Sequence, residues 1–340
     1  MELPILADRF KCVIYEKNEL KLLDRRLYPH RTEYVVCRDV ESVARAIEDM
    51  VVQGAAVIAY TAGYGLALAA SMSKNMDREE LRKMLLKAGE RLRMTRPTGA
   101  ELFHVIESSL AVGLKSIDEG RDPADEISRH VYGLMVRGEE IARKTGEHAS
   151  RLLDDGDKVL TNCYAGPALV YALLYAREKG LRVKAFVPET RPYLQGARLT
   201  APTLKEAGIE TVLVPDPCAG QLIKRREVSK YITATDRVAL DGSIANKVGT
   251  YLYAVVASKH DIPFYVLAYT GPDRKTYTYE DIIIEERPPK EVLTLAGMDT
   301  APEGVKAYYP AFDIVPPKYI AGIITERGVF HPSEMKSYWG

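Results

Sequence analysis

The stretch Val-Pro-Glu-Thr-Arg-Pro-Tyr-Leu-Gln-Gly-Ala-Arg-Leu-Thr, residues 187–200, joins a predicted strand to a predicted helix. The apolar run 183–187 is typical of a buried strand, and the amphipathic segment 197–207 is typical of a helix. In an open α/β sheet, ligands bind at the carboxyl ends of strands, where helix N-termini offer N–H groups to anions. The polar side chains at this edge are Glu189, Thr190, Arg191 and Gln195.

The same order of strand and polar turn recurs on both sides of this stretch. Residues 158–161 lead into Asn162-Cys163-Tyr164-Ala165-Gly166 and a helix, and residues 231–235 lead into Asp236. Because the carboxyl ends of parallel strands meet at one edge of a sheet, we expect a thiol, a carboxylic acid and several hydrogen-bonding groups to lie there.

The alternation of short β-rich runs with helical segments after residue 157 predicts a parallel, doubly wound sheet. The runs are Val159-Leu160, Val183 to Val187, Thr211 to Val214, Tyr231 to Thr235 and Phe264 to Ala268. A long helical stretch, Pro123 to Leu153, precedes them and ends at the turn 154–157. We therefore predict an α/β protein with a small N-terminal α+β domain, residues 1–155, and a Rossmann-like domain, residues 156–340. No G-x-G-x-x-G or Walker motif follows any of these strands.

The N-terminal part is expected to contain short antiparallel strands and several helices. Residues 12–15 and 34–37 are strand-like and flank a charged stretch. Asp39 is a plausible N-cap for a helix that buries one apolar face. The residues expected on that face are Val43, Ile47, Met50 and Val51.

Two places in this part are candidates for phosphate binding. Gln53-Gly54-Ala55-Ala56 precedes an Ala- and Gly-rich helix, and Gly54 leaves N–H groups open to an anion. A tightly packed helix without a ligand is at least as probable from composition. Arg96 precedes Pro97 and a new helix, so it is a phosphate candidate or an ordinary surface arginine.

A third candidate is Lys247. The segment Asn246 to Tyr251 is expected to open a helix. A lysine at a helix N-terminus is electrostatically misplaced unless an anion neutralises it. Lys247 is therefore predicted to face a ligand, the alternative being an exposed surface lysine.

The composition disfavours several function classes. The chain has 340 residues with 47 Lys+Arg and 47 Asp+Glu, so no global field would attract nucleic acid or an anionic membrane. No apolar run reaches the roughly 20 residues of a membrane span, and the first ten residues lack signal-peptide order, so a cytoplasmic protein is expected. The chain has few Asn and Gln residues and many Lys, Arg and Glu residues, a composition that favours a thermophilic source.

The four cysteines are widely spaced and form no C-x-x-C pair, so the sequence predicts neither a zinc site nor a disulfide framework. Cys12 and Cys37 lie in strand-like segments and are expected to be buried hydrophobic residues. Cys163 follows a strand and precedes a helix, whose dipole could lower the pKa of its thiol.

Taken together, these residues resemble those of the methylthioribose-1-phosphate isomerases over nearly the whole length. The matching stretches are Arg96-Pro97-Thr98, Asn162 to Gly166, Glu189 to Ala201, Asp236-Arg237, Asn246 to Tyr251, Ile262 to Val266, Pro310 to Asp313 and Ile323 to Gly328. The resemblance implies that Cys163 and Asp236 are catalytic. It also implies a homodimer through the large domain, and it extends to ribose-1,5-bisphosphate isomerases and, more weakly, to initiation-factor 2B alpha, beta and delta subunits.

The sequence departs from the family pattern in two places. Where the family usually has Arg-Gly-Ala-Pro, this chain has Gln53-Gly54-Ala55-Ala56, which removes a guanidinium expected to hold phosphate. The sequence of the predicted helix after Cys163, residues 167–179, also differs from the one that is usual in the family. The resemblance therefore implies the catalytic pair but leaves the exact sugar phosphate open.

The implied reaction explains the residue types. A furanose with phosphate on its anomeric oxygen needs an acid for ring opening, and Asp236 is the candidate because burial would raise its pKa. Cys163 would exchange the C2 proton, or position the substrate if the hydrogen moves as hydride. The substrate-binding residues expected are Gln53, Gly54, Ala55, Arg96, Gln195, Asn246 and Lys247, with no metal and no redox cofactor.

Three functions stay open from sequence. The first is an isomerase of methylthioribose-1-phosphate or of another sugar phosphate, such as ribose-1,5-bisphosphate or 5-deoxyribose-1-phosphate. The second is a regulatory subunit that senses a nucleotide or sugar phosphate, which the loss of arginine at Gln53 would favour. The third is an interaction protein of the initiation-factor type, against which the retained Cys163 and Asp236 argue.

Overall fold

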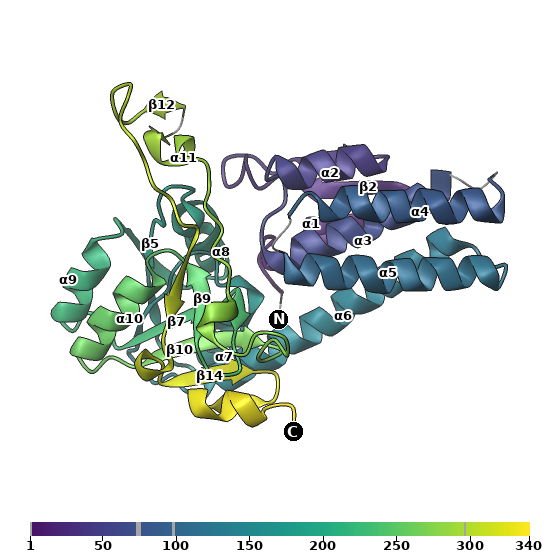
Figure 1. Cartoon of the computed structure of the whole chain (residues 1–340). Helices are drawn as coiled ribbons and strands as arrows, with labels where there is room; N and C mark the ends of the chain where they lie inside the picture. Colours follow the sequence, from purple (N-terminus) through teal and green to yellow (C-terminus); the bar gives the residue numbers. More distant parts are fainter. Residues whose placement is uncertain (1, 73–75, 97–98, 296) are drawn as a thin grey trace. The chain divides into compact units, whose positions relative to one another are not determined.

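The structure is a computed structural model that describes residues 2–72, 76–96, 99–295 and 297–340 (Figure 1). The chain divides into two compact units. The N-terminal unit is Ile5–Glu140, and the C-terminal unit is Ile141–Gly340 together with Met1–Pro4. This division falls inside helix α6 (Pro123–Ser150), whereas the predicted boundary between residues 155 and 156 comes after the end of that helix.

The N-terminal unit contains an antiparallel sheet of three strands. A one-turn helix, α1 (Arg9–Cys12), leads into β1 (Val13–Glu16), β2 (Glu19–Leu23) and β3 (Tyr34–Cys37), in the order β1-β2-β3. The sequence prediction missed β2. Leu20 and Leu22 are buried while Glu19 and Lys21 are partly exposed, which is the two-residue alternation of a half-buried strand.

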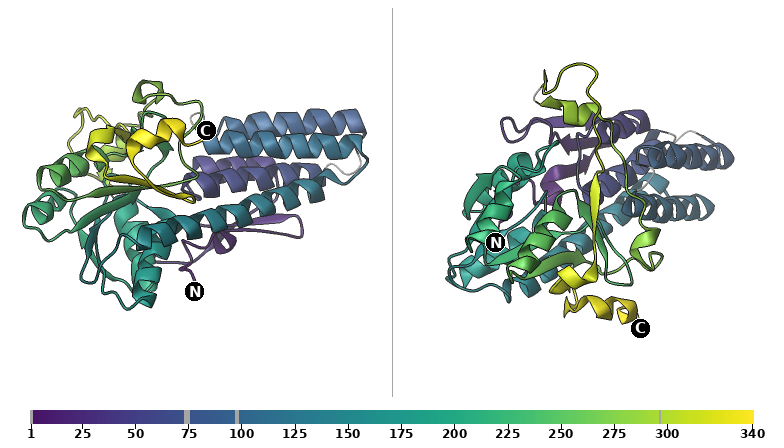
Figure 2. Two further views of the ribbon diagram at one scale, coloured as in Figure 1. Left: turned by 90° about the horizontal axis from the view of Figure 1, so that it is seen from below. Right: turned by 60° about the vertical axis from the view of Figure 1, so that its left-hand side comes forward.

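Helices complete this unit: α2 (Val40–Glu48), α3 (Ala55–Met72), α4 (Arg78–Arg93), α5 (Ala100–Asp118) and the first part of α6. Figure 2 shows α3 to α6 running side by side. Asp39 caps α2, as predicted, and both Asp39 and Asp77 form capping boxes, at the starts of α2 and α4. The prediction that Met50 and Val51 lie in α2 is wrong, because Met50 has a left-handed φ of 61° after the helix end.

Among the described residues, one helix, α3, has the length and hydropathy of a membrane span. However, 67% of it is buried inside the structure. It packs against α2, α4 and α5, and Gly63 and Gly65 allow side chains from neighbouring helices to approach closely. A helix that is apolar all round is expected at such a central position, so packing accounts for its composition.

The C-terminal unit is built on a seven-stranded sheet in the order β15-β14-β10-β7-β4-β5-β6. Its strands are β4 (Lys158–Leu160), β5 (Lys184–Pro188), β6 (Glu210–Val214), β7 (Lys230–Ala234), β10 (Phe264–Tyr269), β14 (Gly322–Thr325) and β15 (Gly328–Phe330). All pair in parallel except β15. Counted along the chain, the parallel strands follow the 3-2-1-4-5-6 order of a Rossmann fold, which confirms the predicted doubly wound sheet.

The connecting helices cover this sheet. They are α7 (Gly166–Glu178), the π-helix η1 (Gly196–Thr200) with α8 (Ala201–Glu206), α9 (Cys218–Lys224) and α10 (Thr250–Lys259). Right-handed crossovers place α7 and α8 on one face of a sheet with this order, and α9 and α10 on the other. In agreement, α9 packs against α10, and both contribute to a core with the stacked rings of Tyr231 and Phe264.

The C-terminal unit also contains a three-stranded sheet, whose strands all come after β7 in the sequence. Strands β8 (Arg237–Val238), β9 (Ile244–Lys247) and β13 (Phe312–Val315) pair antiparallel in the order β13-β9-β8. Asn246 and Lys247 therefore lie on a strand, and the prediction that they open a helix is wrong. The helix α10 begins only at Thr250, after the left-handed Gly249.

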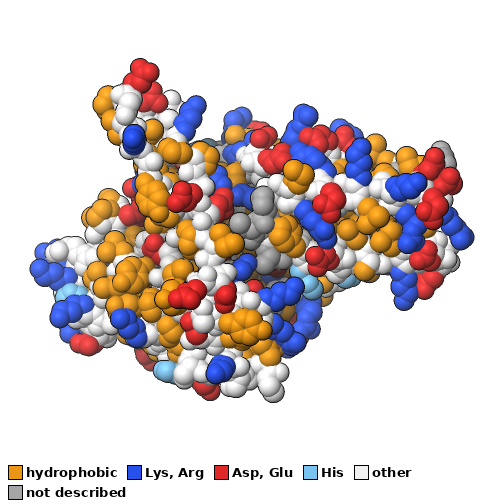
Figure 3. Space-filling model, in the orientation of Figure 1, with side chains coloured by type: hydrophobic (Ala, Val, Ile, Leu, Met, Phe, Trp, Pro, Cys, Tyr) orange, Lys and Arg blue, Asp and Glu red, His pale blue; other side chains and the backbone are white. Residues whose placement is uncertain are grey.

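Residues 272–310, which we call the arm, connect β10 to β13. The arm contains the short elements η2 (Tyr279–Asp281), α11 (Lys290–Leu293), β11 (Thr294–Leu295) and β12 (Met298–Asp299). The chain ends with η3 (Pro317–Tyr319), β14, β15 and η4 (Pro332–Ser337). On the face drawn in Figure 3, basic and acidic side chains are interspersed, in keeping with the equal numbers of both.

Candidate active site

The two candidate catalytic residues follow neighbouring strands at the point where the strand order reverses. The order of the sheet changes direction between β4 and β7, and Cys163 comes three residues after β4 while Asp236 comes two residues after β7. A crevice at the carboxyl ends of the strands at such a switch point is the usual ligand site of open α/β sheets. The topology thus brings together the thiol and the acid that the sequence singled out.

The backbone of Cys163 is held in an uncommon conformation. Its φ is 57°, a left-handed value that few non-glycine residues adopt. The Cys163 N–H donates to Thr190 Oγ1 at 3.1 Å, and its carbonyl accepts a hydrogen bond from Thr200 Oγ1. Contacts from the β5 loop and from η1 therefore fix the position of the thiol.

Burial raises the pKa of the Cys163 thiol to about 11, while the Lys247 ammonium opposes this rise and Asp236 adds to it. The thiol is consequently protonated at neutral pH. This corrects the sequence-based expectation of a pKa lowered by the helix dipole. Helix α7 begins at Gly166, three residues further on, and the effect of a helix dipole falls off within about one turn.

Asp236 keeps access to solvent, yet protein surrounds its carboxyl group closely enough to change its ionisation. Burial raises the pKa of this carboxyl, Lys247 lowers it and Glu285 raises it further. The Asp236 N–H donates to Ala245 O at 3.0 Å, which joins the residue to β9. The direction of the shift is the one that a group acting as an acid near neutral pH requires.

Lys247 lies close enough to Cys163 and Asp236 to influence both. It is only 7% exposed, and its Nζ lies 4.7 Å from the centre of the Phe312 ring and 5.7 Å from that of Tyr309. Aromatic faces attract an ammonium group, which helps to hold it in a buried place. The N-terminus of α10 is capped separately, because the Asp313 carboxylate accepts from Gly249 N–H at 2.6 Å and from Tyr251 N–H at 3.1 Å.

The loop after β5 completes this side of the site. The Asp216 carboxylate accepts from the N–H groups of Thr190 and Arg191, both at 2.7 Å. The Arg191 guanidinium donates to Val292 O and Thr294 O, which ties the loop to the arm. In the described chain, the buried Oε1 of Gln195 has no hydrogen-bond partner. Leaving such an oxygen unsatisfied costs about 1–3 kcal/mol, and a water molecule or a ligand that donates a hydrogen bond would remove that cost.

Gly196 is required where this loop enters η1. A Cβ at Gly196 would lie 1.8 Å from Pro188 O, which is backbone and cannot move aside easily. We expect Gly196→Ala to lower the free energy of unfolding by at least about 1–3 kcal/mol, the usual cost of overpacking. Urea unfolding measures this change. Gly220→Ala in α9 is the matched control, because its Cβ would meet nothing within 4 Å, and an equal loss there would contradict the steric argument.

The N-terminal unit brings together its own predicted residues. Gly54, with φ 89°, and Ala55 are exposed at the start of α3, whereas Gln53 is buried and donates from Nε2 to Met50 O at 3.1 Å. The Arg96 guanidinium contacts Met50 Sδ. Pro97 and Thr98 lie outside the described residues. The sequence reasoning missed Arg25, which is 1% exposed and donates to Gln53 O at 2.6 Å.

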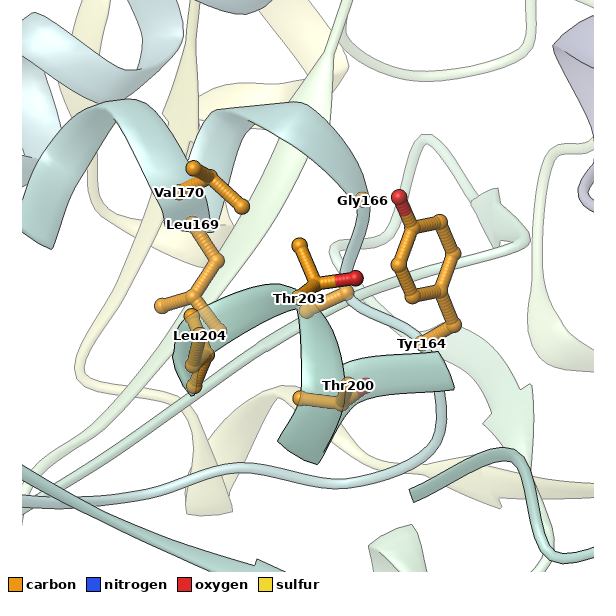
Figure 4. A pocket seen from close by; sticks show the side chains of 8 residues that line it. Tyr164, Gly166, Leu169, Val170, Thr200, Thr203 and Leu204 are labelled. Atoms are coloured by element: carbon orange, nitrogen blue, oxygen red, sulfur yellow. The ribbon is translucent and has the colours of Figure 1, made fainter. Parts of the chain in front are cut away.

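A small cavity lies beside the Cys163 loop. Figure 4 shows Tyr164, Gly166, Leu169 and Thr203 among its lining residues, which come from α7, α8 and the turn before α7. It has room for about one water molecule, so it does not hold a sugar phosphate. Within the described ranges, no group of three or more His, Cys, Asp or Glu side chains is placed to hold a metal ion.

The comparisons with known proteins agree with this architecture. The sequence pattern of the initiation factor 2 subunit family matches residues 51–332. The chain belongs to this family. Within it, the chain is 39% identical to methylthioribose-1-phosphate isomerase 1 of Pseudothermotoga lettingae over 325 residues, which is 93% of each chain.

Two solved structures of the family are also similar. One is 5-methylthioribose 1-phosphate isomerase from Pyrococcus horikoshii OT3, with a TM-score of 0.83, 35% identity and coverage of 96% of this chain and 93% of that one. The other is translation initiation factor eIF-2B, subunit delta, from A. fulgidus, with a TM-score of 0.81, 36% identity and coverage of 98% and 97%. The family therefore contains proteins named for two different activities on one fold.

Proposed function

We propose that the protein is an aldose–ketose isomerase that converts 5-methylthioribose-1-phosphate to the corresponding ribulose-1-phosphate, a reaction of methionine salvage. The observation that carries the proposal is the meeting of Cys163, Asp236 and Lys247 at the switch point of the sheet. The relatives named as isomerases, at 39% identity over most of the chain, support the same substrate class.

Asp236 acts as the acid for ring opening. Burial raises the pKa of its carboxyl, the direction that favours the protonated acid, and the proton passes to the ring oxygen as the bond from that oxygen to C1 breaks. The carboxylate left behind can then take the proton of the C2 hydroxyl as the ketone forms. The acid is thereby regenerated within one turnover.

The C2 hydrogen moves to C1 while Cys163 contacts the substrate. A thiol with a pKa of about 11 is a thiolate in only about one molecule in 10⁴ at pH 7, so it is a poor proton acceptor in the free protein. This favours transfer of the hydrogen as hydride, with Cys163 orienting the sugar, over removal of the C2 proton by a thiolate.

The remaining candidates bind the sugar phosphate. Lys247 supplies a cation, and Asn246 and Gln195 supply neutral hydrogen-bonding groups, of which Gln195 Oε1 can accept from a sugar hydroxyl. In the N-terminal unit, Gln53, Gly54 and Ala55 at the start of α3 and the nearby Arg96 are assigned to phosphate binding. No redox cofactor or metal takes part in this scheme.

We further propose that the protein is a cytoplasmic homodimer that binds neither nucleic acid nor membrane. The interspersed surface charges argue against binding to nucleic acid and the burial of α3 argues against a membrane span, while the homodimer rests on the family resemblance. A thermophilic source is part of the same proposal and rests on composition.

A turnover assay tests the function. Purified protein is incubated with methylthioribose-1-phosphate, ribose-1,5-bisphosphate and 5-deoxyribose-1-phosphate, and ketose formation is followed by NMR. We expect the highest kcat/KM on the first. Preference for either of the others would move the proposal to that substrate, and no turnover of any would overturn the isomerase assignment.

A regulatory subunit of the initiation-factor 2B type is the second candidate, since the likeness to the A. fulgidus structure matches that to the isomerase. Such a subunit would show no isomerase activity and would bind partner subunits. Affinity capture from the source organism, followed by mass spectrometry, distinguishes the two functions.

Gln53 offers a test of the phosphate assignment. An arginine there would bind phosphate by charge-assisted hydrogen bonds, roughly twice as strong as neutral ones. We expect Gln53→Arg to lower KM for methylthioribose-1-phosphate by roughly tenfold, or about 1.4 kcal/mol, with a smaller gain at high salt. The exposed Gln221→Arg adds the same charge in α9 and should leave KM unchanged. An unchanged KM in Gln53→Arg would mean that glutamine in place of the family's arginine does not weaken phosphate binding.

A further inference from the structure

The hydroxyl group of Thr250 forms three hydrogen bonds to residues that flank the candidate site, and the phenol of Tyr231 lies beside it. Thr250 is the first residue of α10 and is completely buried. Its Oγ1 accepts from Asn162 Nδ2 and Asn246 Nδ2, both at 3.0 Å, and donates to Lys247 O at 2.6 Å. One donor and two acceptor positions are thus occupied.

Asn162 carries this connection to Cys163. Its Nδ2 also donates to Lys247 O at 3.3 Å, and its Oδ1 accepts from Thr190 Oγ1 at 3.2 Å, where Pro188 O competes for the same hydrogen at an equal distance. Thr190 Oγ1 in turn accepts from the Cys163 N–H. Asn162 is 1% exposed and Thr190 is 2% exposed, so the hydrogen bonds among Thr250, Asn162 and Thr190 are buried, and the one from the Cys163 N–H is partly buried.

This network joins two parts of the site that the sequence separates widely. Cys163 follows β4, whereas Asn246 and Lys247 end β9, more than 80 residues later. Hydrogen bonds of this kind strengthen one another in a low dielectric and fix one arrangement of the groups. The left-handed backbone of Cys163 needs such support, because a sparsely populated conformation persists only where its surroundings hold it.

We propose that Thr250 is a positioning residue of the isomerase, whose hydroxyl holds the Asn162-Cys163 segment and the Asn246-Lys247 strand end in one fixed geometry. The inference rests on the proposed function for its catalytic consequence. The hydroxyl does not touch the substrate, and it acts through Asn162 and Lys247.

Thr250→Val tests the role of the hydroxyl, since it replaces the hydroxyl by a methyl group of similar size. We expect kcat for methylthioribose-1-phosphate to fall by about 10²-fold, the cost of a displacement of roughly 1 Å among reacting groups. KM should change much less, because the substrate-binding side chains remain present. Thr250→Ser retains the hydroxyl and should restore most of kcat.

Thr61→Val is the matched control. Thr61 is equally buried, in α3, and donates only to Val57 O at 2.8 Å. Thermal unfolding of all variants shows whether they fold alike. A folded Thr250→Val with wild-type kcat would overturn the proposal, and so would a Thr250→Ser variant as slow as Thr250→Val.

A readout without substrate separates this inference from the proposed function. The pH dependence of Cys163 alkylation by iodoacetamide, followed on the Cys163 peptide by mass spectrometry, reports how near the Lys247 ammonium lies. We expect the alkylation profile of Thr250→Val to move to higher pH, and an unchanged profile would overturn the network.

Thr190→Val removes the hydroxyl at the other end of the same network. It provides the test of the network if Thr250→Val does not fold. It should also lower kcat and shift the alkylation profile, and a wild-type result for both would overturn the proposal. If the wild type turns over no sugar phosphate, the proposed function fails, whereas the alkylation profiles still decide whether Thr250 holds Cys163 and Lys247 together.

Discussion

Replacement of Cys163 by alanine is expected to reduce kcat by about 10²-fold or more, because the thiol no longer orients the sugar and a misplacement of roughly 1 Å among reacting groups costs about that much. Binding of the sugar phosphate should stay within about tenfold, or roughly 1.4 kcal/mol, because Lys247 and Gln195 remain in place. Isothermal titration calorimetry with substrate and a turnover assay measure the two quantities separately.

Cys218→Ala is the control for this experiment. Cys218 is exposed at the start of α9, so its loss should leave turnover unchanged. A Cys163→Ala enzyme with a nearly normal rate would reduce Cys163 to a packing residue.

The wild-type reaction in D₂O shows how the C2 hydrogen moves. Because the thiol is protonated in the free protein, we expect the product to retain the C2 hydrogen at C1. Deuterium at C1 of the product, seen by NMR, would instead indicate proton exchange through a thiolate.

Replacement of Asp236 by asparagine is the second change with a large expected effect. The variant keeps the shape of the side chain and removes its proton, so turnover should fall by about 10²–10⁴-fold. Asp236→Glu retains a carboxyl group and should keep part of the activity. Asp261→Asn is the control, because Asp261 is exposed and asparagine tolerates its left-handed φ of 58°.

The pH profile checks the same assignment. Burial raises the pKa of Asp236, and an acid catalyst is active only while protonated. In the wild type, kcat/KM should therefore fall as pH rises through that raised pKa. The residual activity of Asp236→Asn should not show this fall. Retained activity in Asp236→Asn with an unaltered profile would remove Asp236 from the mechanism.

Local signals were sufficient for much of the fold. Capping boxes at Asp39 and Asp77 depend on residues within one turn, and alternating β-rich and helical runs reflect hydrophobic periodicity, so both were predictable. Strand β2 was missed because its charged residues alternate with Leu20 and Leu22, a pattern that is short and easily taken for a loop. The strand β9 was taken for a helix start because its pairing partners lie in β8 and β13, the latter more than 60 residues away.

The identities of Cys163 and Asp236 as candidates came from the sequence, since each follows a strand-like run and matches a family pattern. The sequence did not predict their ionisation, because burial and the distance to Lys247 depend on chain segments that meet only in the fold. The helix-dipole argument therefore gave the wrong direction for the pKa of Cys163.

By itself, the sequence determined which residues bear reactive groups and which strand ends carry them, since both are properties of short segments. Only the tertiary structure decided that β4 and β7 are neighbours at the switch point and that Lys247 lies on a strand. It alone showed that Thr250, Asn162 and Thr190 link Lys247 to Cys163. The physical reason is that hydrogen bonds and charge interactions act over a few ångströms in space, while these residues are up to 88 positions apart along the chain.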